Sequence, residues 1–275
     1  MAPLWWHGQS LFCLPERGIY WPRQNLGRLP EARAPRDGKV RGVAPTFVPA
    51  CECESADGEG GEGGGVLIVA DLHLGKTAAF RAGGVPVPEV IDAELLALSL
   101  LADRLRPDVL LIAGDLLHAR TGTTERVLNA MRRWRARHAE IEVILVRGNH
   151  DLSAGDPPKD LDIRTVAEPF VLHEDDPIAF AHDPAVAREC ARPVICGHLH
   201  PSVSLRDGPA SMRAPCFWVR PHELIVPAYG RFTGTRNIRP GPRDRCLAVG
   251  PGVVVEVRPA ARIAGEAGSR CRTGG

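Results

Sequence analysis

Five short apolar runs in this chain each lead into residue types that bind metal ions. The runs span residues 66–70, 108–114, 141–146, 177–181 and 193–197. Their length and β-branched content predict buried strands. The residues that follow them are Asp71 and His73, then Asp115, then Asn149, His150 and Asp151, then His182, and finally His198 and His200. Ligands of open α/β sheets bind beyond the carboxyl ends of the strands, so we expect one metal site at a shared sheet edge.

Helical periodicity separates the first three of these strands. Residues 88–105 and 123–138 both place apolar side chains at spacings of three and four, which predicts amphipathic helices. Strands that alternate with helices form parallel sheets through right-handed crossovers. Further apolar runs at 224–228 and 253–257 have no long helix between them, which suggests a second sheet packed on the first. The pattern therefore predicts an α/β protein.

Bulk composition limits the partners and the compartment. The chain has 34 basic and 33 acidic residues and a formal net charge of +1, so nucleic-acid binding would need a local basic face. Its 8 cysteines are irregularly spaced without a CxxC pair, and we expect no disulfide framework. We find no signal peptide and no apolar run long enough to span a membrane, and we expect a cytoplasmic protein.

We expect a single domain over residues 1–257. Residues 23–65 are rich in Pro, Gly, Arg and Glu, a composition that buries little apolar surface and predicts a flexible insertion. Residues 258–275 are small, polar and Gly-rich, which predicts a disordered tail.

The candidate ligands combine imidazole and carboxylate groups without a thiolate. This set suits manganese, iron, zinc or nickel better than calcium or magnesium. There are too many ligands for one tetrahedral ion, and they fit two ions that share a carboxylate. Residues two apart in a strand point to the same side, so Asp71 and His73 are expected to reach one ion together, as are His198 and His200. The glycines that directly precede ligands are expected to permit the turns that aim them; they are Gly114, Gly148 and Gly197.

Several motifs occur in a fixed order along the chain. They are VADLHLGK at 69–76, AGDLLH at 113–118, GNHD at 148–151, the lone His182, and CGHLHP at 196–201. This order resembles the calcineurin-like metallophosphoesterase superfamily. Three further segments are GIYWP at 18–22, LRDG to PCFW at 205–218, and PAYGRFTG at 227–234. They look like the bacterial ligase-associated DNA damage response endonucleases, over residues 18–22 and 66–255, with a departure at 23–65.

The resemblance implies a four-layered sandwich in which helices flank two packed, mixed β-sheets. It implies one metal held by Asp71, His73 and His200, a second held by Asn149, His182 and His198, and Asp115 as a bridge between them. Two such cations lower the pKa of a shared water and generate a hydroxide for in-line attack on phosphorus. We expect manganese, with iron, zinc or nickel as alternatives. The implied substrate is DNA in repair, and the implied partners are an ATP-dependent DNA ligase and a helicase-like protein.

Other polar residues near the motifs have two interpretations each. His150 diverges from the adjacent ligand and is expected beside the scissile phosphate, as a general acid or as a cation. Asp151 either orients His150 or caps the following turn. Lys76 and Arg147 either bind phosphate or are ordinary solvated charges, and His118 is a candidate for lining the pocket.

Two other functions fit the same motifs. A nucleotide or small-molecule phosphodiesterase or phosphomonoesterase would use the same metal site and differ only in its substrate. A non-catalytic scaffold would have lost ligands, and no expected ligand type is missing here. Assays on a panel of substrates distinguish a nuclease from a small-molecule phosphoesterase. Measurement of the metal content distinguishes an enzyme from a scaffold that has lost its ligands.

Overall fold

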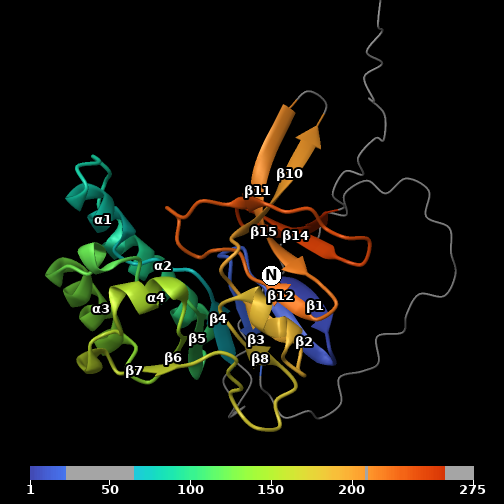
Figure 1. Cartoon of the computed structure of the whole chain (residues 1–275), viewed down its shortest axis with the longest axis horizontal. Helices are drawn as coiled ribbons and strands as arrows, with labels where there is room; N and C mark the ends of the chain where they lie inside the picture. The colour runs from blue at the N-terminus through green and yellow to red at the C-terminus, as the bar shows by residue number, and fades with distance from the viewer. Residues whose placement is uncertain (23–64, 208–209, 258–275) are drawn as a thin grey trace, which may run out of the picture.

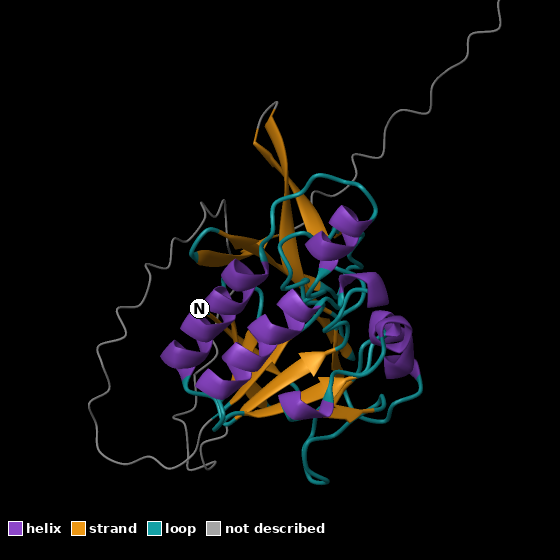
Figure 2. Cartoon of the chain, turned by 90° about the vertical axis from the view of Figure 1, so that its left-hand side faces the viewer, coloured by secondary structure: helices purple, strands orange, loops and turns teal. Residues whose placement is uncertain are grey.

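Two mixed β-sheets form the centre of the structure, a computed structural model that describes residues 1–22, 65–207 and 210–257. The α-helices lie to one side of the sheets, against the outer face of the first (Figures 1 and 2). The predicted α/β fold with two mixed sheets and helices is confirmed. The predicted tail and, apart from Gly65, the predicted insertion lie outside the described residues.

The first sheet has seven strands in the order β1-β2-β3-β4-β5-β6-β7. Their bounds are β1 Ala2–Trp6, β2 Gln9–Cys13, β3 Ile19–Trp21, β4 Val66–Val69, β5 Val109–Ala113, β6 Glu142–Val146 and β7 Ile163–Val166. β1 to β4 pair antiparallel, and β4 to β7 pair parallel. The parallel half matches the predicted crossovers, and β7 was not predicted.

Two long helices cover this sheet, with two short ones beside them. The bounds are α1 Lys76–Ala82, α2 Ile91–Leu105, α3 Glu125–Arg137 and α4 Asn149–Ala154. α2 and α3 confirm the predicted helices and start slightly later than expected. The Glu89 carboxylate accepts from the Val90 and Ile91 amides at the start of α2, and the Thr124 hydroxyl accepts from Val127 N at the start of α3. No helix in the described ranges is long and apolar enough to cross a membrane.

The second sheet takes the order β13-β10-β11-β12-β9-β8, with β14 paired to β11 and β15 paired to β14. The bounds are β8 Ala179–Phe180, β9 Val194–Cys196, β10 Pro201–Asp207, β11 Ala210–Val219, β12 Glu223–Ile225, β13 Arg236–Asn237, β14 Arg245–Gly250 and β15 Val253–Val257. β8 and β9 were predicted to share an edge with β4 to β6, and this was wrong. No α-helix lies between β7 and β8 among the described residues, so β8 does not extend the parallel sheet and pairs with β9 instead.

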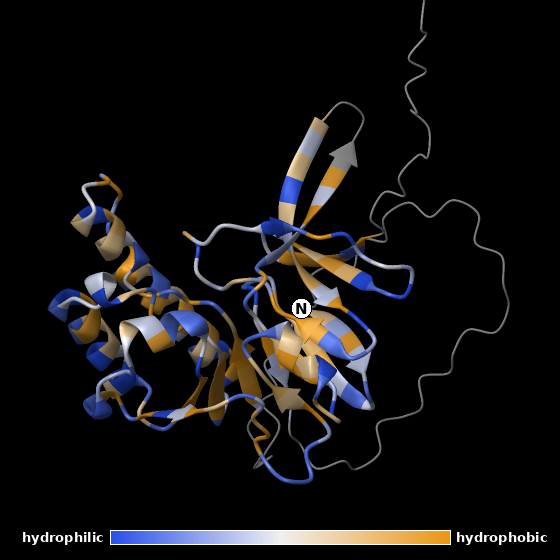
Figure 3. Ribbon diagram, in the orientation of Figure 1, coloured by the Kyte–Doolittle hydropathy of each residue, from blue (hydrophilic) through white to orange (hydrophobic). Residues whose placement is uncertain are grey.

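Side chains from both sheets interdigitate in a common core. In β4, Leu67 and Val69 pack toward the helices, whereas Ile68 packs toward the second sheet. Phe180 and Phe217 meet it from the second sheet and are fully buried. Strands buried on both faces form continuous apolar runs, visible as hydrophobic ribbons in Figure 3. This burial explains why the central strands were recognisable in the sequence.

Candidate metal centre

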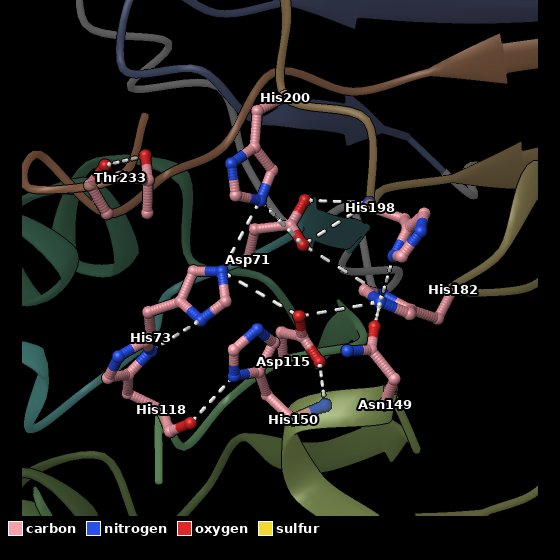
Figure 4. Close-up of polar contacts among 12 residues, drawn as sticks. Asp71, His73, Asp115, His118, Asn149, His150, His182, His198, His200 and Thr233 are labelled. Carbon is pink, nitrogen blue, oxygen red and sulfur yellow. Dashed lines mark hydrogen bonds and ion pairs between the residues drawn. The ribbon is translucent and has the colours of Figure 1, made fainter. Parts of the chain in front are cut away.

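The predicted ligands lie where the two sheets meet (Figure 4). Asp71 follows β4, Asp115 follows β5, and Asn149 begins α4 after β6. His182 follows β8 and His198 follows β9 on the second sheet. The carboxyl ends of strands from both sheets therefore converge on one point.

Most of these ligands have a left-handed backbone. The φ angles are 55° for Asp71, 49° for His73, 54° for Asp115, 68° for His198 and 47° for His200. Such angles are uncommon outside glycine and cost on the order of 1–3 kcal/mol each. The ligands thus lie past the strand ends, where the alternation of an extended strand no longer applies. The expectation that His198 and His200 reach one ion together was therefore wrong, because their rings contact different groups.

One group joins Asp71, His73 and His200. The Nε2 atom of His200 lies 3.2 Å from Asp71 Oδ1 and 3.3 Å from His73 Nε2. Asp71 is fully buried and His73 nearly so. Their ligand atoms are close enough together to hold one ion.

A second group joins Asn149, His182 and His198. The Nε2 atom of His182 lies 2.9 Å from Asn149 Oδ1 and 3.0 Å from His198 Nδ1. The side chains come from α4 and from the ends of β8 and β9, so this group spans the two sheets.

Asp115 lies between the two groups. Its Oδ2 atom is 3.7 Å from His73 Nε2 and 3.5 Å from His182 Nε2. Its Oδ1 atom accepts a hydrogen bond of 2.9 Å from the His150 amide, which fixes the carboxylate. A single carboxylate in contact with both groups has the position that a shared ligand needs.

Backbone carbonyls fix the orientation of two imidazole rings. His182 Nδ1 lies 3.2 Å from Ala113 O, and His200 Nδ1 lies 2.9 Å from Gly234 O. A carbonyl only accepts, so each Nδ1 donates, and in the neutral ring each Nε2 points its lone pair into the cluster. There the lone pairs face carboxylate oxygens and other imidazole nitrogens, an arrangement of acceptors that a cation stabilises. The donor set therefore fits divalent transition metals.

Burial shifts the pKa of two of these groups, whereas the contact with Asp71 raises the pKa of His200 against the effect of burial. Burial, and after it the nearby His200 and Lys76, lowers the pKa of His73 to about 2, so the ring is neutral at pH 7. Burial also raises the pKa of Asp115, which His182 partly offsets. Neutral imidazole is the form that binds metals, and a nearby cation would compensate the buried carboxylate charge.

His150 and His118 stack beside the first group. Their ring centroids are 5.0 Å apart with an interplanar angle of 20°. His150 Nδ1 donates to the His118 carbonyl at 2.8 Å, which leaves Nε2 as its second functional atom. Asp151 accepts from the Gly148 and Leu117 amides, each at 3.0 Å. These contacts favour the capping alternative for Asp151, because the His118 carbonyl is the group that orients His150.

The two basic candidates differ in their surroundings. Lys76 opens α1, and its pKa is lowered by burial against the opposing pull of Asp115 and Asp71. Its ammonium group is therefore near the cluster. Arg147 instead makes a two-point ion pair with Asp156, at 2.9 and 2.7 Å. That pair favours the solvated-charge alternative for Arg147.

The glycines beside the ligands matter chiefly because other groups approach them closely. Only Gly114 has the expected positive φ, of 85°. A Cβ atom at Gly148 would collide with Asp115, and one at Gly197 would lie 2.7 Å from both Ala70 Cβ and Asp71 Oδ2. Close packing of the backbone against the carboxylates thus excludes a side chain at these positions.

Replacing Gly197 with alanine is expected to lower the free energy of unfolding by about 1–3 kcal/mol, because the methyl group must displace Asp71 or its neighbours. Denaturant unfolding measures this loss. Gly234→Ala is the matched control, since nothing lies within 4 Å of its added Cβ. Equal stability of the two variants would contradict the packing argument.

One contact to a ligand was not foreseen from the sequence. The Glu168 carboxylate, which follows β7, accepts from the amides of His182 at 2.6 Å and Asp183 at 3.0 Å. It therefore ties the end of the first sheet to a ligand on the second. No motif marks Glu168, since its partners are backbone amides that any residue supplies.

Comparison with known proteins agrees with this geometry. A family model described as calcineurin-like phosphoesterase matches residues 65–180. The crystal structure of the nuclease MPE of Pseudomonas putida matches with 32% sequence identity and a TM-score of 0.67, covering 93% of this chain and 99% of that chain. The chain belongs to the calcineurin-like phosphoesterase family. The phosphoesterase Yfce of E. coli also matches, with 17% identity, a TM-score of 0.33, and coverage of 70% of this chain and 97% of that one. No curated protein matches the sequence.

As a calcineurin-like phosphoesterase, the chain is a hydrolase of phosphate esters, which confirms the predicted family and enzyme class. The buried His and Asp clusters are typical of dinuclear metallophosphoesterases. The alternative of a non-catalytic scaffold is not supported.

Proposed function

We propose that this phosphoesterase is a two-metal DNA endonuclease. The observation that supports the proposal is the 32% identity to the nuclease MPE over nearly the full length of both chains. Of the predicted functions, a nuclease is therefore favoured over a phosphoesterase of small molecules.

In this proposal, each group of side chains holds one divalent ion. Asp71, His73 and His200 hold the first, Asn149, His182 and His198 hold the second, and Asp115 is shared. When bound, the two ions supply positive charge to the phosphate and lower the pKa of a shared water. Manganese is the proposed metal, with iron, zinc or nickel as alternatives.

The remaining residues act on the phosphate and on the leaving group. His150 is the proposed general acid, because its Nδ1 is held by the His118 carbonyl, and Nε2 is then the atom that, in the protonated ring, gives a proton to the leaving oxygen. Lys76 and His118 lie beside the same group and would bind phosphate oxygens. Asp151 holds the start of α4 and thereby positions His150.

The cellular setting is proposed from the motif resemblance. We propose a role in DNA repair in the cytoplasm, together with an ATP-dependent DNA ligase and a helicase-like protein. Co-purification with the ligase from cells exposed to a DNA-damaging agent is the measurement that tests the association.

A substrate panel tests the nuclease proposal. Metal-depleted protein is reloaded with manganese, iron, zinc or nickel and assayed on linear DNA, circular DNA, cyclic nucleotides and phosphomonoesters. We expect manganese-dependent cleavage of both DNA forms, abolished by a chelator. Cleavage of circular DNA identifies an endonuclease. Turnover of cyclic nucleotides or phosphomonoesters without DNA cleavage would instead establish a small-molecule phosphoesterase.

A further inference from the structure

One surface loop concentrates positive charge without acidic residues. Residues 231–243, here called the arginine loop, contain Arg231, Arg236, Arg239 and Arg243 and no Asp or Glu. All four arginines are exposed. The chain as a whole has a net charge of +1, so this local excess is not a reflection of bulk composition.

The arginines on the exposed side of α3 differ from those of the arginine loop because they pair with acidic residues of α2. Arg126 and Arg133 both pair with Asp92, at 2.8 and 3.0 Å, and Arg137 pairs with Asp103 at 2.7 Å. These ion pairs satisfy the guanidinium groups within the protein, so this face has little charge left for a ligand.

The arginine loop lacks such pairs. Within the described ranges of the chain, the side chains of Arg236, Arg239 and Arg243 have no ion pair or hydrogen bond. The next acidic residue, Asp244, accepts instead from Trp218 Nε1 and from Gly241 N, both at 2.8 Å. The positive charge of the loop is therefore available to an external anion.

Backbone contacts hold this loop beside the metal centre. Gly234 O accepts from His200 Nδ1, and Arg236 N donates to His200 O, both at 2.9 Å. β13 then pairs parallel with β10, with Ile238 N donating to Ser202 O at 2.9 Å. The backbone of the loop is thus hydrogen-bonded directly to His200, a residue of the proposed metal site.

We propose that the arginine loop binds the phosphate backbone of the DNA strand beside the scissile phosphate. The inference rests on the proposed nuclease function and names the surface that recognises its substrate. A run of unpaired guanidinium groups matches a run of phosphates, and each contact releases condensed counter-ions from DNA. Small phosphodiesters are too short to reach the loop and the metal centre together.

The test compares two triple variants with the same change in charge. One carries Arg236→Gln, Arg239→Gln and Arg243→Gln, and the control carries Arg126→Gln, Arg133→Gln and Arg137→Gln. Both are assayed as metal-loaded protein on a 30-nucleotide DNA and on bis(p-nitrophenyl) phosphate. DNA binding is measured by fluorescence anisotropy at several salt concentrations, in a His150→Ala background that slows cleavage.

In the loop variant, the ratio of kcat/KM for DNA to kcat/KM for the small diester is expected to fall about 10- to 100-fold, and the slope of log Kd against log salt to fall by about 2–3. The control variant should keep both values. Wild-type affinity in the loop variant, an equal loss in the control, or no DNA binding by the parent protein would each overturn the inference. If the parent protein binds DNA and the salt slope falls as expected in the loop variant, but the parent protein does not cleave DNA, the inference about the arginine loop holds and the nuclease proposal is refuted.

Discussion

The Asp115→Asn variant is expected to lose roughly 10³-fold or more of kcat/KM for bis(p-nitrophenyl) phosphate. The Oδ2 atom of Asp115 contacts both groups, at 3.7 Å from His73 Nε2 and 3.5 Å from His182 Nε2. An amide has the same shape but carries no negative charge, so it binds two cations poorly. Its carbonyl can still accept from the His150 amide, and the fold should therefore persist.

Two measurements separate this loss from unfolding. The melting temperatures of the metal-free variant and the metal-free parent protein should be equal. Elemental analysis should show that Asp115→Asn binds less than the two equivalents of metal expected of the parent. Asp160→Asn is the matched control, because it removes the same charge from an exposed ion pair with Arg132. An active Asp115→Asn variant would remove the basis for a shared carboxylate.

The His150→Ala variant is expected to retain two metal ions and to lose about 10²- to 10⁴-fold of kcat. His150 contacts the His118 carbonyl and stacks on the His118 ring, and it is not part of either ligand group in the proposal. Its loss should therefore affect turnover more than metal content. His73→Ala provides the contrast, because it should lose metal together with activity.

The choice of leaving group identifies the role of His150. A general acid matters most when the departing oxygen is a poor leaving group, so the loss should be larger on an alkyl ester than on the p-nitrophenyl ester. Equal losses on both esters would indicate a cation that stabilises the phosphoryl group. Depletion of metal in His150→Ala would contradict both roles and make His150 a ligand.

The sequence predicted the central part of this fold well because burial leaves a strong pattern. β4, β5 and β6 are buried on both faces, and continuous apolar runs of that length have few alternatives. The apolar runs predicted neither the N-terminal strands β1 to β3 nor the strands β10, β11 and β14. These strands are partly exposed and antiparallel, so their positions depend on partners distant in sequence.

The site was predicted as a set of residues, but its geometry was not. The order of Asp71, Asp115, Asn149, His182 and His198 indicated the chemistry because each follows a strand. The sequence could not show that two of the five strands belong to a second sheet, because pairing between distant strands leaves no local pattern. It also could not show the left-handed angles at Asp71 and Asp115, since these follow from the packing around the turns.

Because the ligand groups span both sheets, the bound ions would also act as a cross-link between the two halves of the core. A ligand that binds only the native state raises stability by RT ln(1 + [L]/Kd), about 4 kcal/mol at a thousandfold excess over Kd. Heat tolerance of this enzyme should then track the supply of metal in its surroundings. Depletion of the metal would then make the folded protein less stable as well as inactive.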